Sequence, residues 1–193
     1  MNERFEQLVR SIGNCTACHD LPFGINPVVQ LSPAPKILIV GQAPGRKVHD
    51  TGIPWNDKSG DTLRDWLGVS REDFYNPELF SIMPMGFCYP GKGPSGDLPP
   101  RKECAKLWHL QILEHFDKQP ELVLLIGQYA QQYYLKERHK GSLTLNTMSF
   151  GDFLPQYFVL PHPSPRNGIW LRKNPWFAKE VLPALRQKVK EIL

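Results

Sequence analysis

Two short motifs, at residues 41–45 and 162–167, hold the side chains best suited to chemistry. The second reads His-Pro-Ser-Pro-Arg-Asn, and a histidine held in such a turn can donate a hydrogen bond to an oxygen that gathers negative charge during a reaction. The first reads Gly-Gln-Ala-Pro-Gly. Each motif directly follows an apolar run, which is typical of a buried strand of a parallel sheet. Because ligands of such sheets bind outside the carboxyl ends of the strands, we expect both motifs at one site.

Four apolar runs predict the strands that position these motifs, at residues 36–40, 79–83, 121–126 and 157–161. Helical spacing and capping residues predict helices at residues 3–12, 59–67 with Ser59 as cap, 103–116, 128–135 and 174–193 with Asn174 as cap. Residues 43–58 and 85–101 are expected as loops, and residues 136–155 as loop with part of a helix. This alternation predicts an α/β fold, a three-layer α/β/α domain over residues 1–193 with a central four-stranded, mostly parallel sheet.

Composition sets limits on the class of protein. No run approaches eighteen consecutive apolar residues and the N-terminus lacks the apolar core of a signal peptide, so we expect a cytoplasmic protein without a membrane partner. The formal charge of +4 does not by itself argue for nucleic acid. Cations that fall in or beside the expected site loops either neutralise phosphates or form a solvated rim. They are Arg46, Lys47, Lys58, Lys92, Arg101, Lys102, Arg166, Arg172 and Lys173.

Four cysteines form a second candidate site. Cys15 and Cys18 make a C-x-x-C pair, and Cys88 and Cys104 stand sixteen residues apart. Disulfides are not expected in a cytosolic protein. The spacing fits an iron-sulfur cluster held by four thiolates or, as a less favoured alternative, a structural zinc; the thiols could also be free.

Two further motifs lie in the sequence between the motif at residues 41–45 and the motif at residues 162–167. Residues 51–55 read Thr-Gly-Ile-Pro-Trp, and Ser59-Gly60 opens a helix. In sequence and in order, the motifs and the cysteines resemble the uracil-DNA glycosylase superfamily, most closely its iron-sulfur-cluster branch, which is family 4-like. The resemblance extends through most of the chain. It implies a uracil-DNA glycosylase-like fold and a [4Fe-4S] cluster of structural role on Cys15, Cys18, Cys88 and Cys104.

The resemblance also implies roles for the residues of both motifs. An enzyme that acts on a base must extract it from the stack, and Trp55 suits the stacking wall of the pocket that receives it. His162 is placed to stabilise the leaving base. The expected base-binding residues are Gly41, Ala43, Pro44, Gly45 and Trp55. The expected DNA-binding residues are Ser164, Pro165, Arg166, Asn167, Arg172 and Lys173.

Three positions depart from the pattern of the branch. Gln42 replaces a glutamate, Ala43 replaces the Asp or Asn of other branches, and Pro84 replaces an asparagine that reads uracil. For activation of water, the remaining candidates are His49, Asp50 and Asp57, or Gln42 together with backbone carbonyls. Reading of the base is then expected from backbone groups of Met85 and Gly86, or from another side chain.

These residues favour a monomeric, monofunctional DNA glycosylase that flips and excises a deaminated or damaged base, uracil or a related one, in base excision repair. Its partner would be DNA containing an altered base. An alternative is a non-catalytic binder of damaged or single-stranded DNA, for which the three departures argue. A hydrolase of free nucleosides or nucleotides is a third hypothesis, and the basic loop at residues 166–173 argues against it.

Overall fold

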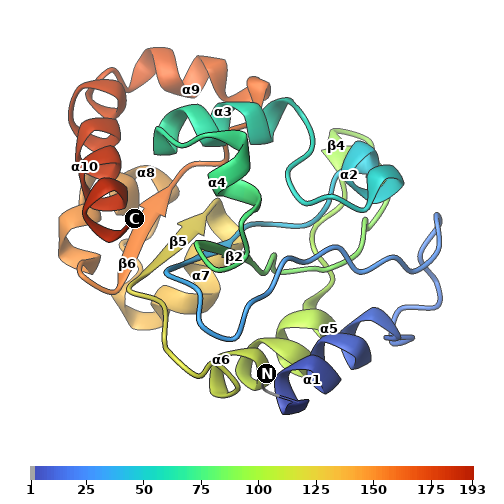
Figure 1. Cartoon of the computed structure of the whole chain (residues 1–193). Coiled ribbons are helices and arrows are strands. Elements are labelled where there is room, and N and C mark those ends of the chain that lie inside the picture. Colours follow the sequence, from blue (N-terminus) through green and yellow to red (C-terminus); the bar gives the residue numbers. More distant parts are fainter. Residues whose placement is uncertain (1–2) are drawn as a thin grey trace.

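The computed structural model describes residues 3–193 and has a parallel sheet between two layers of helices (Figure 1). Strands lie in the order β2 (Phe80–Ile82), β1 (Ile37–Val40), β5 (Leu122–Ile126) and β6 (Tyr157–Leu160). Every pairing within this sheet is parallel. The predicted three-layer α/β/α fold with a mostly parallel four-stranded sheet is therefore confirmed. Gln30 adds an isolated antiparallel bridge to Ile82 on β2.

Alternating side chains of the strands fill two separate cores, because successive residues of a strand point to opposite faces. Ile37 and Ile39 face the core beneath α3 (Lys58–Leu67), α4 (Arg71–Tyr75) and α10 (Leu182–Ile192). Leu38 and Val40 face the other core, which α1 (Glu3–Gly13), α6 (Leu110–Glu114) and α7 (Gln128–Leu135) cover. In Figure 1 these two groups of helices lie above and below the sheet. Both faces are buried, which explains why the strands read as continuous apolar runs.

The helix after the first motif begins differently from the expectation. The sequence predicts Ser59 as its cap, but the N-cap is Asp57, whose Oδ1 accepts the backbone N–H of Gly60 at 2.9 Å. Asp57 has the extended backbone that a cap needs, with φ of −147°. Ser59 already lies within the first turn of α3. The helix ends at Gly68, which has a positive φ of 70°.

Several short elements lie where loops were expected. The loop at residues 43–58 contains α2 (Arg46–Thr51), and the basic loop after the second motif is a 3-10 turn, Pro165–Asn167, followed by α9 (Gly168–Lys173). Residues 85–101 contain an antiparallel hairpin of β3 (Lys92–Gly93) and β4 (Gly96–Asp97). Residues 136–155, expected as loop with part of a helix, contain α8 (Leu143–Met148). A 3-10 turn precedes α8 (Lys136–Arg138) and another follows it (Phe150–Phe153). Elements of one or two turns are too short for an apolar period to be read from sequence.

Two predicted helices are divided by π-helical turns. Residues 103–116 form α5 (Lys102–Cys104), a π turn (Ala105–His109) and α6, and the last helix has a π turn (Phe177–Val181) before α10. Such turns often occur at functional sites, and the first of them directly follows Cys104. Within residues 3–193, no helix is long and apolar enough to cross a membrane.

Candidate functional site

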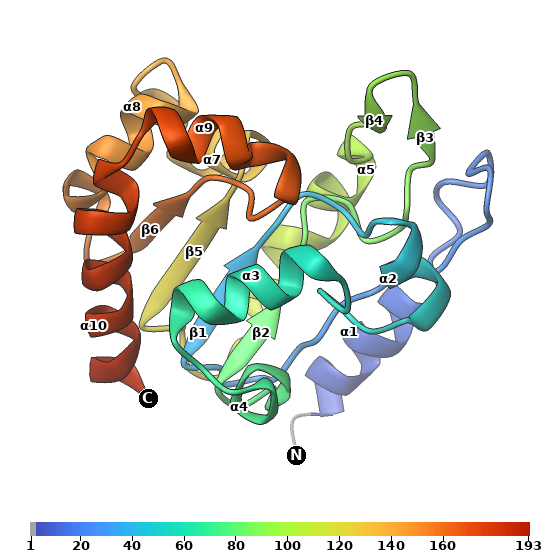
Figure 2. The same ribbon diagram turned by 90° about the horizontal axis from the view of Figure 1, so that it is seen from above.

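A cavity of about 530 Å³ opens at the carboxyl edge of the sheet. Figure 2 shows β1, β5 and β6 running toward this edge, with the hairpin β3–β4 and the start of α9 rising on either side of it. The cavity brings together the first and second motifs, which are far apart in the sequence. The expected site residues that line it are Gly41, Gln42, Ala43, Pro44, Gly45, Trp55, His162, Ser164, Arg166 and Asn167.

Trp55 forms one wall of this cavity, and two glycines fix its position. Its backbone has a φ of 56°, which is uncommon for a residue other than glycine. A Cβ added to Gly41 would come within 2.8 Å of the Trp55 ring, and one added to Gly60 would overlap the Trp55 carbonyl oxygen at 1.7 Å. The ring centroid lies 5.4 Å from that of His162, at a tilt of 31°. An aromatic surface is thus held beside the histidine of the second motif.

His162 follows the end of β6 and is partly buried. Burial lowers the pKa of its imidazole below the ordinary 6.5, because desolvation disfavours the charged ring, while the carboxylates of Asp57 and Asp97 raise it by less. The ring is therefore neutral at pH 7 and can donate one N–H. Asn167 closes the turn, since its side-chain amide donates to the His162 carbonyl at 2.6 Å. His162 is thus a fixed, uncharged donor in the wall of the cavity.

The turn of the first motif is tied to the segment after β2. The N–H of Met85 donates to the Gly41 carbonyl at 3.0 Å, and the N–H of Gly86 donates to the Gln42 carbonyl at 2.9 Å. Neither Met85 nor Gly86 lines the cavity. These two N–H groups hold the motif in place. Of the backbone groups expected to read a base, the Met85 and Gly86 carbonyls therefore remain as candidates.

His49 and Asp50 lie on α2, outside the lining of the cavity. The exposed carboxylate of Asp50 pairs with Arg46, whose Nε lies 2.8 Å from Oδ1. The His49 ring packs 6.1 Å from that of Tyr89, and its Nδ1 is buried without a hydrogen-bond partner within residues 3–193. The structure therefore does not place these two candidates in the lining of the cavity, although the His49 N–H donates to the Gly45 carbonyl at 2.9 Å.

The carboxylates that do line the cavity are Asp57 and Asp97. Sequence reasoning included Asp57 but missed Asp97, which lies on β4 of the hairpin. An added Cβ on Gly45 would lie 3.6 Å from Asp97 Oδ2 and 3.9 Å from Asp57 Oδ2, so both approach the first motif. The one available signal was the run of turn residues at positions 93–96, Gly-Pro-Ser-Gly, which favours a tight hairpin.

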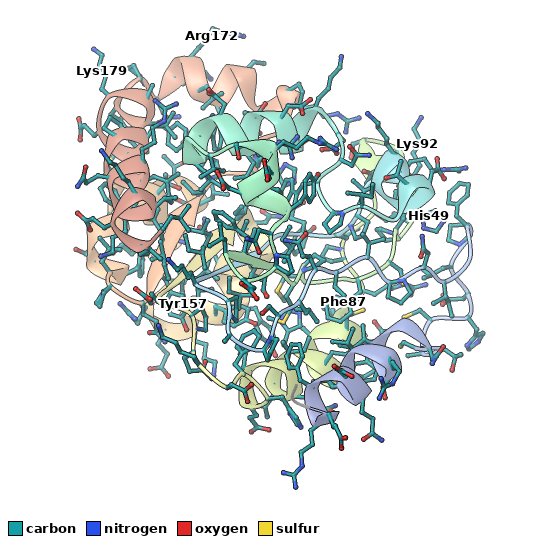
Figure 3. All side chains as sticks on the ribbon, in the orientation of Figure 1. His49, Phe87, Lys92, Tyr157, Arg172 and Lys179 are labelled. Carbon is teal, nitrogen blue, oxygen red and sulfur yellow. The ribbon has the colours of Figure 1, made fainter. Side chains whose placement is uncertain are left out.

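The predicted DNA-binding residues divide into two groups. Arg166 lines the cavity and its Nη1 donates to the Ser95 carbonyl at 3.4 Å, which joins the second motif to the hairpin. Pro165 begins the 3-10 turn at the same place. Arg172 and Lys173 stand at the end of α9, exposed and away from the cavity lining. Figure 3 shows Arg172 projecting outward from the molecule.

All four cysteines line a second, smaller cavity. They are free, and three of them are buried. Burial raises the pKa of the Cys18 and Cys88 thiols and raises that of Cys104 to about 11. The N–H of Phe87 donates to Cys104 Sγ at 3.4 Å.

The wall of this second cavity also holds an unpaired donor. The indole N–H of Trp108 is buried and has no hydrogen-bond partner within the described part of the chain. Within that same part, no three His, Cys, Asp or Glu side chains are grouped so that they could hold a single metal ion. The four thiols nevertheless line one and the same cavity.

Comparisons with known proteins agree with this geometry. The profile described as the uracil DNA glycosylase superfamily matches residues 28–186. The type-4 uracil-DNA glycosylase of Thermotoga maritima is 26% identical over 171 residues, which cover 84% of this chain and 82% of that protein. The type-4 uracil-DNA glycosylase of Archaeoglobus fulgidus is 26% identical over 136 residues, which cover 68% of this chain and 63% of that protein.

Proposed function

Because the chain belongs to the uracil DNA glycosylase superfamily, we propose that it is a monofunctional DNA glycosylase of base excision repair. It hydrolyses the N-glycosidic bond of uracil or a related deaminated or damaged base in DNA. The observation that carries this proposal is the meeting of Trp55, His162 and the Gly41 turn in one cavity at the carboxyl edge of the sheet. A single chain supplies these residues, which supports action as a monomer.

The aromatic wall of the cavity supports extraction of a base. Unstacking and unpairing a nucleotide costs a few kcal/mol, and stacking of a base on an aromatic side chain is worth about 1–3 kcal/mol. Trp55 offers such a ring and is fixed by Gly41 and Gly60, so little further ordering is needed when the base arrives. Stacking on Trp55 thus offsets much of the cost of extraction.

Loss of the base leaves negative charge on its carbonyl oxygen, and His162 provides the donor that stabilises this charge. A donor fixed before the reaction lowers the barrier more than one that must reorient. The neutral state of His162 follows from its lowered pKa. It therefore acts by hydrogen bonding and does not need to be charged.

The turn at residues 162–167 is proposed to hold the DNA strand beside the cavity. Ser164 and Arg166 line the cavity mouth, and the Arg166 guanidinium can pair with a phosphate or stack on a base. Arg172 and Lys173 lie farther along α9 and are proposed to contact phosphates outside the cavity.

A [4Fe-4S] cluster is proposed for the second cavity, held by the four cysteines. Four thiols around one cavity fit this group, and the unpaired Trp108 N–H beside them is a suitable donor to sulfur. The bound cluster would supply iron–thiolate bonds that join the segment after α1 to Cys88 and to Cys104, the last residue of α5. Zinc on the same four thiols is the less favoured alternative.

A non-catalytic binder of damaged or single-stranded DNA is the second candidate. Gln42, Ala43 and Pro84 line the cavity. By resemblance, Gln42 and Pro84 stand where the iron-sulfur branch has a glutamate and an asparagine, and Ala43 stands where other branches have Asp or Asn. A side-chain amide such as that of Gln42 can hold a water molecule but cannot take its proton.

A panel of oligonucleotides separates the two candidates. Single- and double-stranded DNA carrying uracil, hypoxanthine, xanthine or oxidised pyrimidines is incubated with the iron-containing protein, and free base and abasic sites are measured. Release from at least one altered base, with none from undamaged DNA, is the expected result. Tight binding to altered DNA without any release would favour the binder.

A further inference from the structure

We propose that Asp97, carried into the cavity by the hairpin β3–β4, is the catalytic carboxylate that takes a proton from the attacking water. This inference rests on the proposed glycosylase function and supplies the group that Gln42 cannot provide. It depends on three features of the structure: where Asp97 lies, what holds it there, and how the other carboxylates are engaged.

Asp97 lies at the mouth of the cavity, beside the first motif. Its Oδ2 is 3.6 Å from the position that a Cβ on Gly45 would occupy. Its charge acts on His162, whose pKa it raises in opposition to burial. Asp97 thus lies beside the Gly45 turn, and its charge acts on the imidazole of His162. Before DNA arrives Asp97 is exposed, so water reaches it freely.

Tyr89 fixes the orientation of this carboxylate. The buried Tyr89 hydroxyl donates to Asp97 Oδ1 at 3.2 Å. Burial and the Asp97 charge raise the pKa of Tyr89 above its ordinary value, so the hydroxyl keeps its proton and remains a donor. With Oδ1 held by Tyr89, Oδ2 is directed to the Gly45 side and is available for a water molecule.

The hairpin itself is braced on two sides. The N–H of Leu98 donates to the Gly91 carbonyl at 2.9 Å, which closes its base. The Arg166 guanidinium reaches the Ser95 carbonyl at its tip. An added Cβ on Gly96 would lie 2.3 Å from Arg166 Nη1, so glycine is required for this contact. The hairpin therefore holds Asp97 across the cavity from the turn that carries His162.

The other carboxylates are less suited to this role. Asp57 caps α3, and its Oδ1 is committed to the Gly60 N–H. Asp50 is paired with Arg46 outside the cavity lining. Each lining carboxylate has one oxygen engaged, Asp57 by the Gly60 N–H and Asp97 by the Tyr89 hydroxyl. Asp97 is preferred because the N-terminus of α3 favours the negative charge on Asp57 throughout the reaction.

Hydrolysis of the N-glycosidic bond can be written with one water molecule, His162 and Asp97 so that all atoms and charges are accounted for. The water oxygen forms a bond to C1′ of the deoxyribose while the bond from C1′ to the base nitrogen breaks, and that electron pair leaves with the base. His162 donates a hydrogen bond to the carbonyl oxygen of the departing base. The proton of the water passes to Asp97 and then to the base or to solvent. The products are the free base and an abasic sugar.

Single-turnover base release tests this inference, on the altered base that the wild-type protein cleaves best. Asp97→Asn is expected to lose about 10²-fold or more in rate, while it binds DNA at least as tightly because one negative charge is removed. Asp65→Asn is the matched control, since Asp65 is an exposed carboxylate on α3 with 78% of its side chain accessible. It is expected to keep the wild-type rate. Tyr89→Phe is expected to lose less than Asp97→Asn, because Asp97 remains but is less well oriented.

Chemical rescue separates proton transfer from a structural role. Asp97→Ala leaves space for a small anion, so formate or azide should restore its rate by about tenfold or more without changing Asp97→Asn. Wild-type rates for Asp97→Asn, or loss of activity in Asp97→Ala that neither anion restores, would overturn the assignment while the glycosylase function stands. Absence of base release by the wild-type protein would overturn the proposed function, and the assignment with it.

Discussion

The cavity at the sheet edge and the cysteine centre, which is formed by Cys15, Cys18, Cys88 and Cys104, are built in opposite ways. The motifs of the cavity extend directly from β1 and β6, and backbone hydrogen bonds from Met85 and Gly86 hold the first of them. The cysteines come from segments with little regular structure: two follow α1, one precedes the hairpin, and one lies on the three-residue helix α5. The cavity therefore takes its shape from the sheet, whereas the cysteine centre depends on whatever its thiols bind.

The two regions meet at the residue that follows Cys88. Tyr89 hydrogen-bonds Asp97 at the cavity and stacks on Phe23, with ring centroids 5.4 Å apart. Phe23 in turn lies beneath the Arg46 guanidinium on α2, 4.1 Å from its ring centre. Disorder at the four cysteines would free Tyr89 and Phe23, and with them the hydrogen bond that holds Asp97 at the cavity. Loss of the cysteine centre should therefore disturb both regions, but a change in the cavity should disturb only one.

The largest expected effect is therefore at the cysteines. Cys15→Ala, Cys18→Ala, Cys88→Ala and Cys104→Ala should each lose iron, the brown colour and most soluble, folded protein, because each removes one bond that joins distant segments. Anaerobic purification with metal analysis and thermal unfolding measures this. Lys106→Ala, at an exposed position two residues after Cys104, should keep its iron. Stoichiometric zinc without iron would reject the cluster.

Changes at the cavity wall should leave the iron in place. His162→Ala should lose about 10²–10³-fold in base release but keep most of its affinity for altered DNA, because stacking on Trp55 remains. Trp55→Ala should lose both. Fluorescence anisotropy and base-release assays separate these results, with His139→Ala as a control outside the cavity. Equal loss of affinity in both variants would contradict the separate roles.

Protonation of His109, which lies between the two regions, should make the free energy of unfolding depend on pH. Its Nε2 contacts the Pro84 carbonyl at 3.1 Å, and burial lowers its pKa to about 4. The unfolded chain binds this proton near pH 6.5 and the folded chain only near pH 4, so the free energy of unfolding falls as pH drops through that window. The expected loss is on the order of 3 kcal/mol. Urea unfolding of His109→Gln should show a flatter pH dependence, and an unchanged slope would exclude this role.

The smallest expected effect is on DNA affinity. Arg166→Ala and Lys173→Ala should each weaken binding and reduce its salt slope by about one for every phosphate that the variant no longer neutralises. Arg166→Ala should also slow base release, because the guanidinium braces the hairpin, whereas Lys173→Ala should not. Titrations at several salt concentrations test this. Unchanged slopes would mean that these cations form a solvated rim.

Sequence predicted the parts of the molecule that long patterns determine. The strands and the position of His162 follow from apolar runs buried on both faces, and the meeting of residues 41–45 with residues 162–167 follows from parallel strands. Asp97 could not be found in this way, because a hairpin of two-residue strands has no period and its position depends on Arg166, which comes much later in the chain. The use of the Met85 and Gly86 N–H groups within the fold was missed for a related reason, since the sequence does not reveal which backbone donors are already bonded.

The central claim is that the cavity at the sheet edge releases a base by hydrolysis. Its most direct test is chromatographic measurement of free base from a uracil-containing oligonucleotide and its altered-base relatives, together with abasic sites, in iron-containing wild-type protein and His162→Ala. We expect equal amounts of free base and abasic site from the wild-type protein and a rate about 10²–10³-fold lower for His162→Ala. Binding of altered DNA with no base released, or release by His162→Ala at the wild-type rate, would contradict it.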